Sequence, residues 1–282
     1  HHLPPHAYLH PHAYASTYQA LHDALVVNTS LAELSLRGNT LRARGLRVLA
    51  PALRTNASLR SLTLSSCNLG AEGAAVLVES LHDNSGLTAL ELKSNALGRD
   101  GTAALASLLP HHPCLARLDL GNNKIDAAAA QPLIDALPAA VALTALLLAS
   151  NSLGEAGGVA MAEVLRGNTT LTELNLRSNQ LKDAGAAAIA DALSCHPTLG
   201  ELVASNNGLT AEAEAALDKA RRVCANIHIL AVHSCACVRT CARVCVMCVM
   251  CSLYTSGARD AKGGGQEVAE RGGQERQRGR QG

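Results

Sequence analysis

The chain has 282 residues, of which 48% are hydrophobic, and this is enough apolar material to bury a sizeable core. It contains no Phe or Trp and only four Tyr, so the core must consist almost wholly of Leu, Ala, Val and Ile, which is rare in soluble enzymes. The formal net charge of +1 excludes a global electrostatic preference for nucleic acid, acidic substrates or membrane surfaces.

The beginning of the chain carries no repeat. Residues 1–16 are rich in His and Pro, and we expect them to be disordered. They lack the basic region and the apolar stretch of a secretion signal. Seven of the ten cysteines lie in residues 224–251, whereas Cys67, Cys114 and Cys195 are scattered. Scattered single cysteines favour a reducing compartment, so we expect a cytoplasmic location.

An internal repeat of 28 residues organises residues 17–222, which we assign to one repeat domain. A partial repeat that is mostly helix comes first, because Leu21 and Leu25 lie 28 residues before Leu49 and Leu53. Seven full repeats of the pattern L-x-x-L-x-L-x-x-N-x-L follow without insertion or deletion. They start at Leu31, Leu59, Leu87, Leu115, Leu143, Leu171 and Leu199.

Each repeat predicts one short strand followed by one helix. Residues alternate between apolar and polar in the first half, as in Leu34-Ser35-Leu36, and the second half places Leu46, Leu49 and Leu53 at helical spacing. Neither element can bury its apolar side alone, so the repeats must stack. Parallel strands lie about 4.8 Å apart and helices about 8 to 10 Å apart, which bends the stack. The sequence therefore predicts an α/β solenoid with a parallel sheet of about seven strands on the concave face and the helices on the convex face.

The ninth position of the repeat is Asn in six of the seven repeats and Cys67 in the second. An amide side chain can both donate and accept hydrogen bonds, so we expect these residues to form a structural ladder along the turns, with Cys67 as a buried, unreactive thiol. Small residues recur near each predicted helix start, where we expect them to allow close approach of neighbouring helices. They are Gly45, Gly73, Gly101, Ala129, Gly157, Gly185 and Ala213.

The repeat resembles a known family. The L-x-x-L-x-L-x-x-[NC]-x-L pattern, the LGAEGA segment at residues 69–74 and the 28-residue period together resemble leucine-rich repeats of the ribonuclease-inhibitor type. Ribonuclease inhibitor, the repeat arrays of NOD-like receptors and the Ran GTPase-activating protein belong to that family. The resemblance implies a horseshoe fold and a binding function.

The periodicity stops after Arg222. Asp218 and Arg221 replace apolar residues of the last predicted helix, which indicates a polar cap that closes the stack. Residues 223–255 form a Cys-rich apolar tail in which zinc binding and lipidation are alternatives to an unstructured segment. Residues 256–282, rich in Gly, Gln, Arg and Glu, are predicted to be disordered.

The repeats offer no group of residues that predicts catalysis, a metal site or a cofactor. We expect four histidines to face solvent or to cap helix C-termini, because they lie at predicted helix ends or in the loops that follow; they are His82, His111, His112 and His196. The glycosylation sequons at Asn28, Asn56 and Asn168 share one repeat phase, so we attribute them to the repeat itself.

The outward positions of the predicted sheet are the candidate binding surface, because their side chains carry no packing role on a rigid scaffold. Mixed charges surround an apolar spot at Ala145, Leu147 and Ala149. We expect a partner to bind Glu33, Ser35, Arg37, Glu91, Lys93, Arg117, Asp119, Leu147, Glu173, Asn175, Arg177 and Glu201.

The sequence therefore predicts a non-enzymatic scaffold that holds a protein partner on its concave face. We expect no small-molecule substrate and no membrane contact, and nucleic acid is disfavoured because the basic tail has no interleaved aromatic residues. Two alternatives rest on the family resemblance alone: a GTPase-activating protein resembling the Ran regulator, and the repeat end of a NOD-like receptor.

Overall fold

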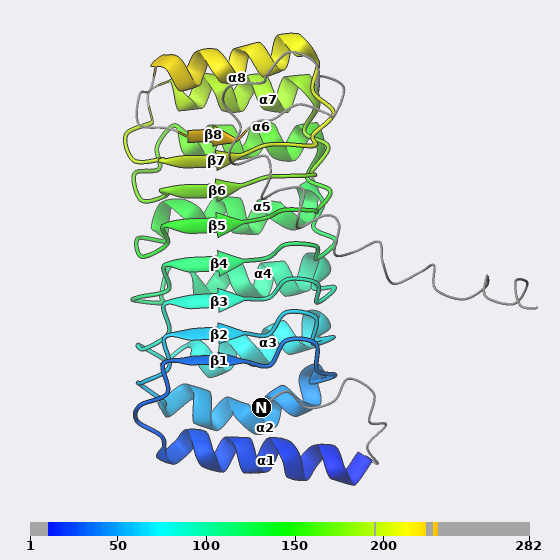
Figure 1. The fold of residues 1–282 in the computed structure, drawn as a ribbon, viewed down its shortest axis with the longest axis vertical. Coiled ribbons are helices and arrows are strands. Elements are labelled where there is room, and N and C mark those ends of the chain that lie inside the picture. Colours follow the sequence, from blue (N-terminus) through cyan, green and yellow to red (C-terminus); the bar gives the residue numbers. More distant parts are fainter. Residues whose placement is uncertain (1–10, 195, 224–227, 231–282) are drawn as a thin grey trace, which may run out of the picture. The chain divides into compact units, whose positions relative to one another are not determined.

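Helices and strands alternate along the chain with the predicted 28-residue period (Figure 1). The computed structural model describes residues 11–194, 196–223 and 228–230. The strands are β1 (Glu33–Ser35), β2 (Ser61–Thr63), β3 (Ala89–Glu91), β4 (Arg117–Asp119), β5 (Ala145–Leu147), β6 (Glu173–Asn175), β7 (Glu201–Val203) and β8 (His228–Leu230). The helices are α1 (Pro11–Val27), α2 (Arg42–Thr55), α3 (Gly70–Leu81), α4 (Gly98–Leu108), α5 (Ala127–Ala136), the 3-10 turn η1 (Leu137–Ala139), α6 (Gly154–Leu165), α7 (Lys182–Leu193) and α8 (Ala211–Val223).

The strands form one open parallel sheet in chain order, from β1 to β8. Equivalent residues of successive repeats lie side by side, as Leu118 pairs with Leu146 and Leu146 with Leu174. The helices form a row on one side of the sheet and leave its other side uncovered by helices (Figure 1). This arrangement confirms the predicted α/β solenoid with a parallel sheet.

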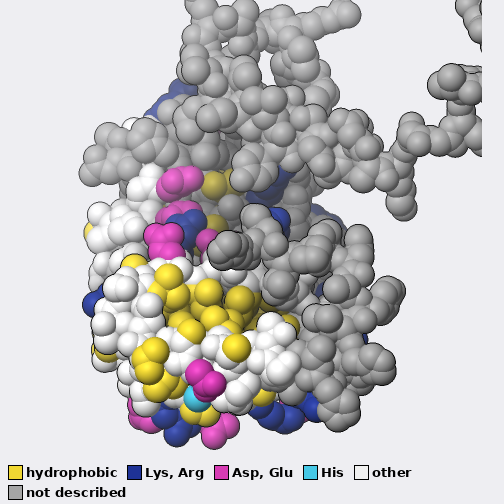
Figure 2. Space-filling view, turned by 60° about the horizontal axis from the view of Figure 1, so that its bottom comes forward, with side chains coloured by type: hydrophobic (Ala, Val, Ile, Leu, Met, Phe, Trp, Pro, Cys, Tyr) yellow, Lys and Arg dark blue, Asp and Glu magenta, His cyan; other side chains and the backbone are white. Residues whose placement is uncertain are grey.

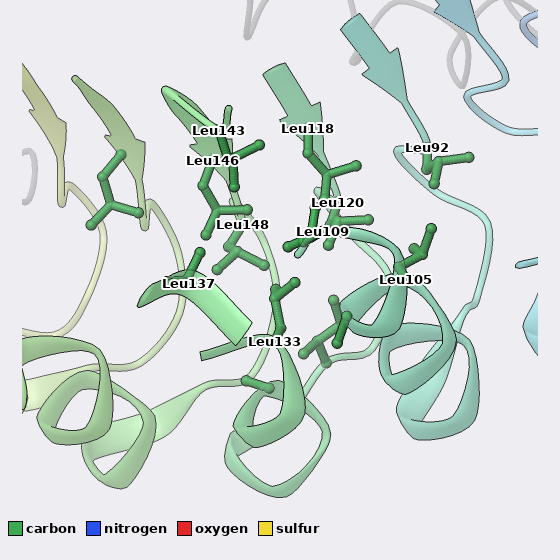
Figure 3. Packing of buried hydrophobic residues seen from close by; sticks show 14 of the residues in the cluster. Leu92, Leu105, Leu109, Leu118, Leu120, Leu133, Leu137, Leu143, Leu146 and Leu148 are labelled. Atoms are coloured by element: carbon green, nitrogen blue, oxygen red, sulfur yellow. The ribbon is translucent and has the colours of Figure 1, made fainter. Parts of the chain in front are cut away.

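The core lies between the sheet and the row of helices. Leu118 and Leu120 from the β4 segment, and Leu146 from β5, point toward leucines of the helices such as Leu105 and Leu133 (Figure 3). All five are at most 1% exposed. Burying one leucine contributes roughly 1.5 to 3 kcal/mol, so the repeated Leu columns supply the main force that holds the repeats together.

The structure differs from the sequence predictions at both ends of the repeat domain. Helix α1 begins at Pro11, inside the segment 1–16 that was expected to be disordered, and β8 extends the sheet beyond Arg222 to eight strands. Strand β8 does not carry the repeat pattern. It joins the sheet by pairing with β7, where Ile229 lies beside Leu202. Of the predicted Cys-rich tail at residues 223–255, the structure describes only residues 223 and 228–230, and the predicted disordered segment 256–282 lies outside the described residues.

Candidate partner-binding face

The turn that follows each strand has the same conformation in every full repeat, and this holds the strand ends on the uncovered side of the sheet in place. The residue seven positions after the first Leu has a positive φ in all seven full repeats, between 53° at Asn122 and 77° at Gly38. The asparagine ladder then ties each turn to the next: Asn95 donates its N–H to Asn123 Oδ1 at 2.9 Å, and Asn123 Nδ2 donates to the Leu92 carbonyl at 3.0 Å. The predicted structural role of these asparagines is confirmed.

We call the uncovered side of the sheet the sheet face. It consists of the side chains two, four and six positions after the first Leu of each repeat, and parallel pairing aligns them in three columns. All twelve predicted partner-binding residues lie on this face. Its length across β1 to β8 is about 34 Å, since neighbouring strands lie about 4.8 Å apart.

An ion pair crosses the middle of the sheet face. Arg117 of β4 reaches over β5 and forms a two-pronged hydrogen bond with Glu173 of β6, one prong from Nη1 and one from Nη2 to Oε1 at 3.2 Å. This hydrogen bond raises the pKa of Arg117 above its already high ordinary value. Between the two strands stands Ala145, which is only 5% exposed. The predicted apolar spot is therefore smaller than expected: Leu147 and Ala149 are partly exposed, but Ala145 is buried.

Asp119 lies beside this ion pair and is partly buried. Its Oδ1 accepts the N–H of Gly121 at 2.8 Å. Burial raises the pKa of the Asp119 carboxyl above its ordinary value, and the nearby Glu91 acts in the same direction, whereas the Gly121 hydrogen bond and the Lys93 and Arg117 charges oppose it. The centre of the face therefore holds charges that largely satisfy one another.

Four exposed charges of the sheet face, which we call the rim charges, form no ion pair with another described residue, although Lys93 acts on the Asp119 charge from a distance. Glu33, Arg37, Lys93 and Glu201 are exposed, and none of them forms an ion pair with another described residue. Ser35 is also exposed. The other predicted residues are partly buried, namely Glu91, Arg117, Asp119, Leu147, Glu173, Asn175 and Arg177. The rim charges are thus the ones that remain available to a partner.

Two histidines have a role that the sequence analysis missed. His112 and His196 are buried rather than exposed, and each accepts an N–H of the loop that leads into the next strand: Nδ1 accepts from Leu115 at 3.1 Å and from Leu199 at 3.1 Å. Burial lowers the pKa of both imidazoles. The expectation of solvent exposure is wrong for these two and holds for His82 and His111, which are exposed. The sequence did contain a signal for this burial, because His112 and His196 occupy the same repeat position as Asn56, Asn84 and Asn168.

The same position explains the sequons. Asn56 is 7% exposed, and its Nδ2 donates to the Leu25 and Asn28 carbonyls at 2.8 and 3.0 Å. Its Oδ1 accepts the N–H groups of Ser58 and Leu59. A glycan attached at Nδ2 would break these bonds, so Asn56 has a structural role, as predicted.

Cys67 interrupts the asparagine ladder. Its Sγ donates to the Leu36 carbonyl at 3.1 Å, but it offers no amide oxygen to the turn before it. The residue is buried, and burial raises the pKa of its thiol to about 11. The thiol is therefore protonated at neutral pH, which agrees with the prediction of an unreactive cysteine.

The described part of the chain shows neither a metal-binding cluster nor a membrane-spanning helix. Residues 11–194, 196–223 and 228–230 contain no cluster of three or more His, Cys, Asp or Glu side chains placed to hold a metal ion. None of the helices described there is long and apolar enough to cross a membrane.

Comparison with known proteins identifies the repeat. The family described as "Leucine Rich repeat" matches residues 27–50, 55–78 and 167–190. The chain contains leucine-rich repeats. Among solved structures, leiomodin-1 actin-binding site 2 aligns with 75% of this chain and 87% of its own length, at 15% identity and a TM-score of 0.28. The tropomodulin C-terminal domain of Caenorhabditis elegans aligns with 73% of this chain and 92% of its own length, at 12% identity and a TM-score of 0.36. No curated protein matches the sequence.

Proposed function

We propose that this leucine-rich-repeat protein is a non-enzymatic scaffold that holds a protein partner on the sheet face. The observation that carries the proposal is the set of four exposed rim charges that form no ion pair with another described residue, on a face whose central charges are paired with one another. Charges of this kind steer and orient a partner, whereas the ladder and the Leu columns keep the face rigid.

The charge balance of the face favours a protein over a nucleic acid. Five of the twelve residues are acidic, and four are basic. A phosphate backbone needs clustered Lys and Arg, so this mixture would repel as many phosphates as it attracts. A protein surface with both signs of charge can match the mixture. The face has no Trp or Tyr, the usual anchors of tight interfaces, and its affinity is therefore expected to be modest and to fall as salt rises.

We further propose that the partner is met in the cytoplasm. The side chains of the sequon residues Asn56 and Asn168 are buried in the loops that they cap, which leaves no room for glycans. Cys67 and Cys114 are free thiols. Both features suit a reducing compartment without glycosylation.

The test of this function is quantitative capture of partners from a cell lysate by the full chain and by single charge reversals. Arg37→Glu and Lys93→Glu change exposed residues of the sheet face. Each should lower capture of the specific partner by about tenfold, because a rim attraction becomes a repulsion. Circular dichroism should show an unchanged fold.

Arg44→Glu on α2 and Arg99→Glu on α4 are the matched controls. Both residues are exposed on the helix side, and neither forms an ion pair with another described residue. Each control makes the same change in net charge. Equal losses in all four variants would place the binding site away from the sheet face. Acceleration of a small GTPase by catalytic amounts of the chain would overturn the non-enzymatic part of the proposal.

A further inference from the structure

Charges of opposite sign occupy different parts of the repeat. At the first five positions of the seven full repeats, which include the strands, five residues are acidic and two are basic. At the seventh to twelfth positions, which form the turns, six residues are basic and one is acidic. Parallel pairing aligns equivalent positions, so the turns form a basic border along the sheet face, which we call the turn edge. Its basic residues are Arg37, Arg42, Lys93, Lys124, Arg177 and Lys182.

The basic charges of the turn edge are available to a partner, and most acidic charges of the strands lie apart from them. Five of the six basic residues are exposed and form no ion pair with another described residue; they are Arg37, Arg42, Lys93, Lys124 and Lys182. The acidic residue of the turns, Asp126, instead caps α5, because its Oδ1 accepts the Ala129 N–H at 2.8 Å. Figure 2 looks past the α1 end of the stack onto part of the sheet and shows Asp and Glu side chains gathered along one side of it.

Two residues of the turn edge adopt a backbone conformation that favours glycine. Arg42 and Lys182 have φ values of 52° and 51°. The repeats that have glycine at this position, Gly70, Gly98 and Gly154, have φ values of 61°, 58° and 62°. A long side chain is strained in this conformation, and such strain persists where the side chain has a function. Both described repeats that keep this conformation without glycine carry a basic residue, so the charge explains the residue better than the turn does.

The dimensions of the sheet face fit a helix that crosses the strands. Side chains two and six positions after the first Leu are about 13 Å apart along a strand, and a helix with its side chains is about 10 to 12 Å wide. Neighbouring strands are about 4.8 Å apart, close to the 5.4 Å between successive helical turns, so each repeat meets about one turn. An extended segment returns a side chain to the same flank only about every 6.6 Å, which matches the repeats less well.

The charge pattern disfavours two other occupants. The residues of this chain outside the described ranges carry eight Lys or Arg and four Asp or Glu, so their net positive charge is repelled by the turn edge. A nucleic acid has negative charge on all sides, and the acidic strand positions next to the turn edge repel it. A protein helix can place its acidic residues on one flank alone.

We propose that the sheet face binds a helix of a partner protein that lies across the strands, with acidic side chains on the flank that meets the turn edge and basic side chains on the flank that meets the strand positions. The acidic flank pairs with exposed charges such as Arg37 and Lys93, and the basic flank pairs with Glu33 and Glu201 at the two ends of the face. This inference names the partner of the proposed scaffold and therefore rests on the proposed function.

The probe is a fluorescent, alanine-based helical peptide of about 18 residues, long enough to cover the roughly 24 Å from the first to the sixth repeat. It carries Glu along one flank and Lys along the opposite flank. The full chain should bind it saturably in an anisotropy titration, with an affinity that falls as salt rises. The control peptide has the same composition, with Glu and Lys mixed on both flanks. It should bind at least about fivefold more weakly, because each flank then meets like charges.

Two variants of the protein separate binding from a structural role of the turns. Arg42→Gly and Lys182→Gly each remove one charge of the turn edge and relieve the strained backbone. Each should raise the melting temperature and lower the affinity for the peptide by about threefold. A residue with a structural role alone would not move the two measurements in opposite directions. Arg99→Gln on α4 removes an exposed charge outside the turn edge and should leave the affinity unchanged.

Equal binding of the two peptides overturns the proposal, and so does an affinity that ignores both glycine variants. Absence of saturable binding, as would follow if residues 231–282 or a second copy covered the face, also overturns it. Tighter binding of single-stranded RNA than of the peptide would make the turn edge a nucleic-acid site. If the peptide fails while partner capture still depends on Arg37 and Lys93, the helix is wrong and the scaffold stands. Capture that ignores both residues removes the scaffold itself.

Discussion

One side chain caps the loop before each of β1, β2, β3, β4, β6 and β7, and at β4 and β7 that side chain is a histidine. His112 accepts the Leu115 N–H through Nδ1, so Nδ1 must be unprotonated, and the proton of the neutral ring lies on Nε2. Nε2 of His112 and of His196 is buried and has no hydrogen-bond partner in the part of the chain that the structure describes. Asn84 occupies the same repeat position and leaves no donor unsatisfied, because its Nδ2 donates to the Leu53 carbonyl at 2.6 Å.

This difference predicts an acid-sensitive stability. Burial lowers the pKa of His112 and His196 below the ordinary 6.5, so the unfolded chain binds protons that the folded chain does not. Their contribution to the free energy of unfolding is therefore complete above about pH 6.5 and decreases as the pH falls toward the lowered value. Urea unfolding between about pH 8 and about pH 5 should show this decrease. The double variant His112→Asn, His196→Asn should flatten it and be more stable than the unchanged chain at the acid end.

The control for this effect is His111→Asn, which changes an exposed histidine next to His112. It should leave the pH dependence as it was. A double variant that lost stability with acid as steeply as the unchanged chain would show that the two imidazoles are not the acid-sensitive groups.

The sequence predicted some of these residues correctly and others not, for physical reasons. The ladder was predictable, because one residue type recurs at one position and its amide can bond in both directions. The burial of His112 was not predicted, because a histidine in a loop was assigned by its polarity and not by the asparagines that share its position. The bond between Arg117 and Glu173 was also not predicted, since it spans two repeats and depends on Ala145 being small enough for the arginine to pass over it.

At the scale of the element, the spacing between α6 and α7 depends on two glycines, Gly158 and Gly185. A Cβ at Gly158 of α6 would lie 2.9 Å from Gly185 Cα of α7, closer than atoms can approach. Gly185 itself was predicted to allow close approach, and its nearest neighbours, Glu155 O and Gly158 Cα, confirm this. Gly73 and Gly157 differ, because the atom nearest to each is the Cβ of Leu69 or Leu153 in its own repeat.

Gly158→Ala should therefore reverse the usual sign of a helical glycine substitution. Alanine in place of glycine inside a helix normally stabilises by roughly 0.5 to 1 kcal/mol. Here the methyl group must push two helix backbones apart, and we expect a loss of about 1 to 3 kcal/mol in thermal or urea unfolding. Gly167→Ala is the control, since a Cβ there would meet no atom within 4 Å. A stabilised Gly158→Ala variant would mean that α6 and α7 are less closely packed than the structure shows.

At the scale of the whole molecule, a repeat stack is stabilised mainly by contacts between neighbours, so its ends decide how much core is exposed. The sequence placed the end of the stack at the polar last helix, α8, and a stack that ends there should keep its stability when residues 223–282 are removed. The structure instead adds β8 to the edge of β7. Leu202 and Ala204 of the β7 segment are 0% and 2% exposed, whereas Leu34 and Leu36, at the edge that lacks a neighbouring described strand, are partly exposed.

Two truncations of the chain distinguish whether α8 or β8 closes the stack. A chain that ends at Ser234 keeps β8 and should unfold at the same temperature as the full chain. A chain that ends at Val223 loses β8, leaves Leu202 as uncovered as Leu34, and should lose about 1 to 3 kcal/mol of stability. For a domain of this size, each kcal/mol lowers the melting temperature by roughly 2 to 4 °C. Differential scanning calorimetry of both truncations gives the comparison directly, and equal melting temperatures would restore α8 as the element that closes the stack.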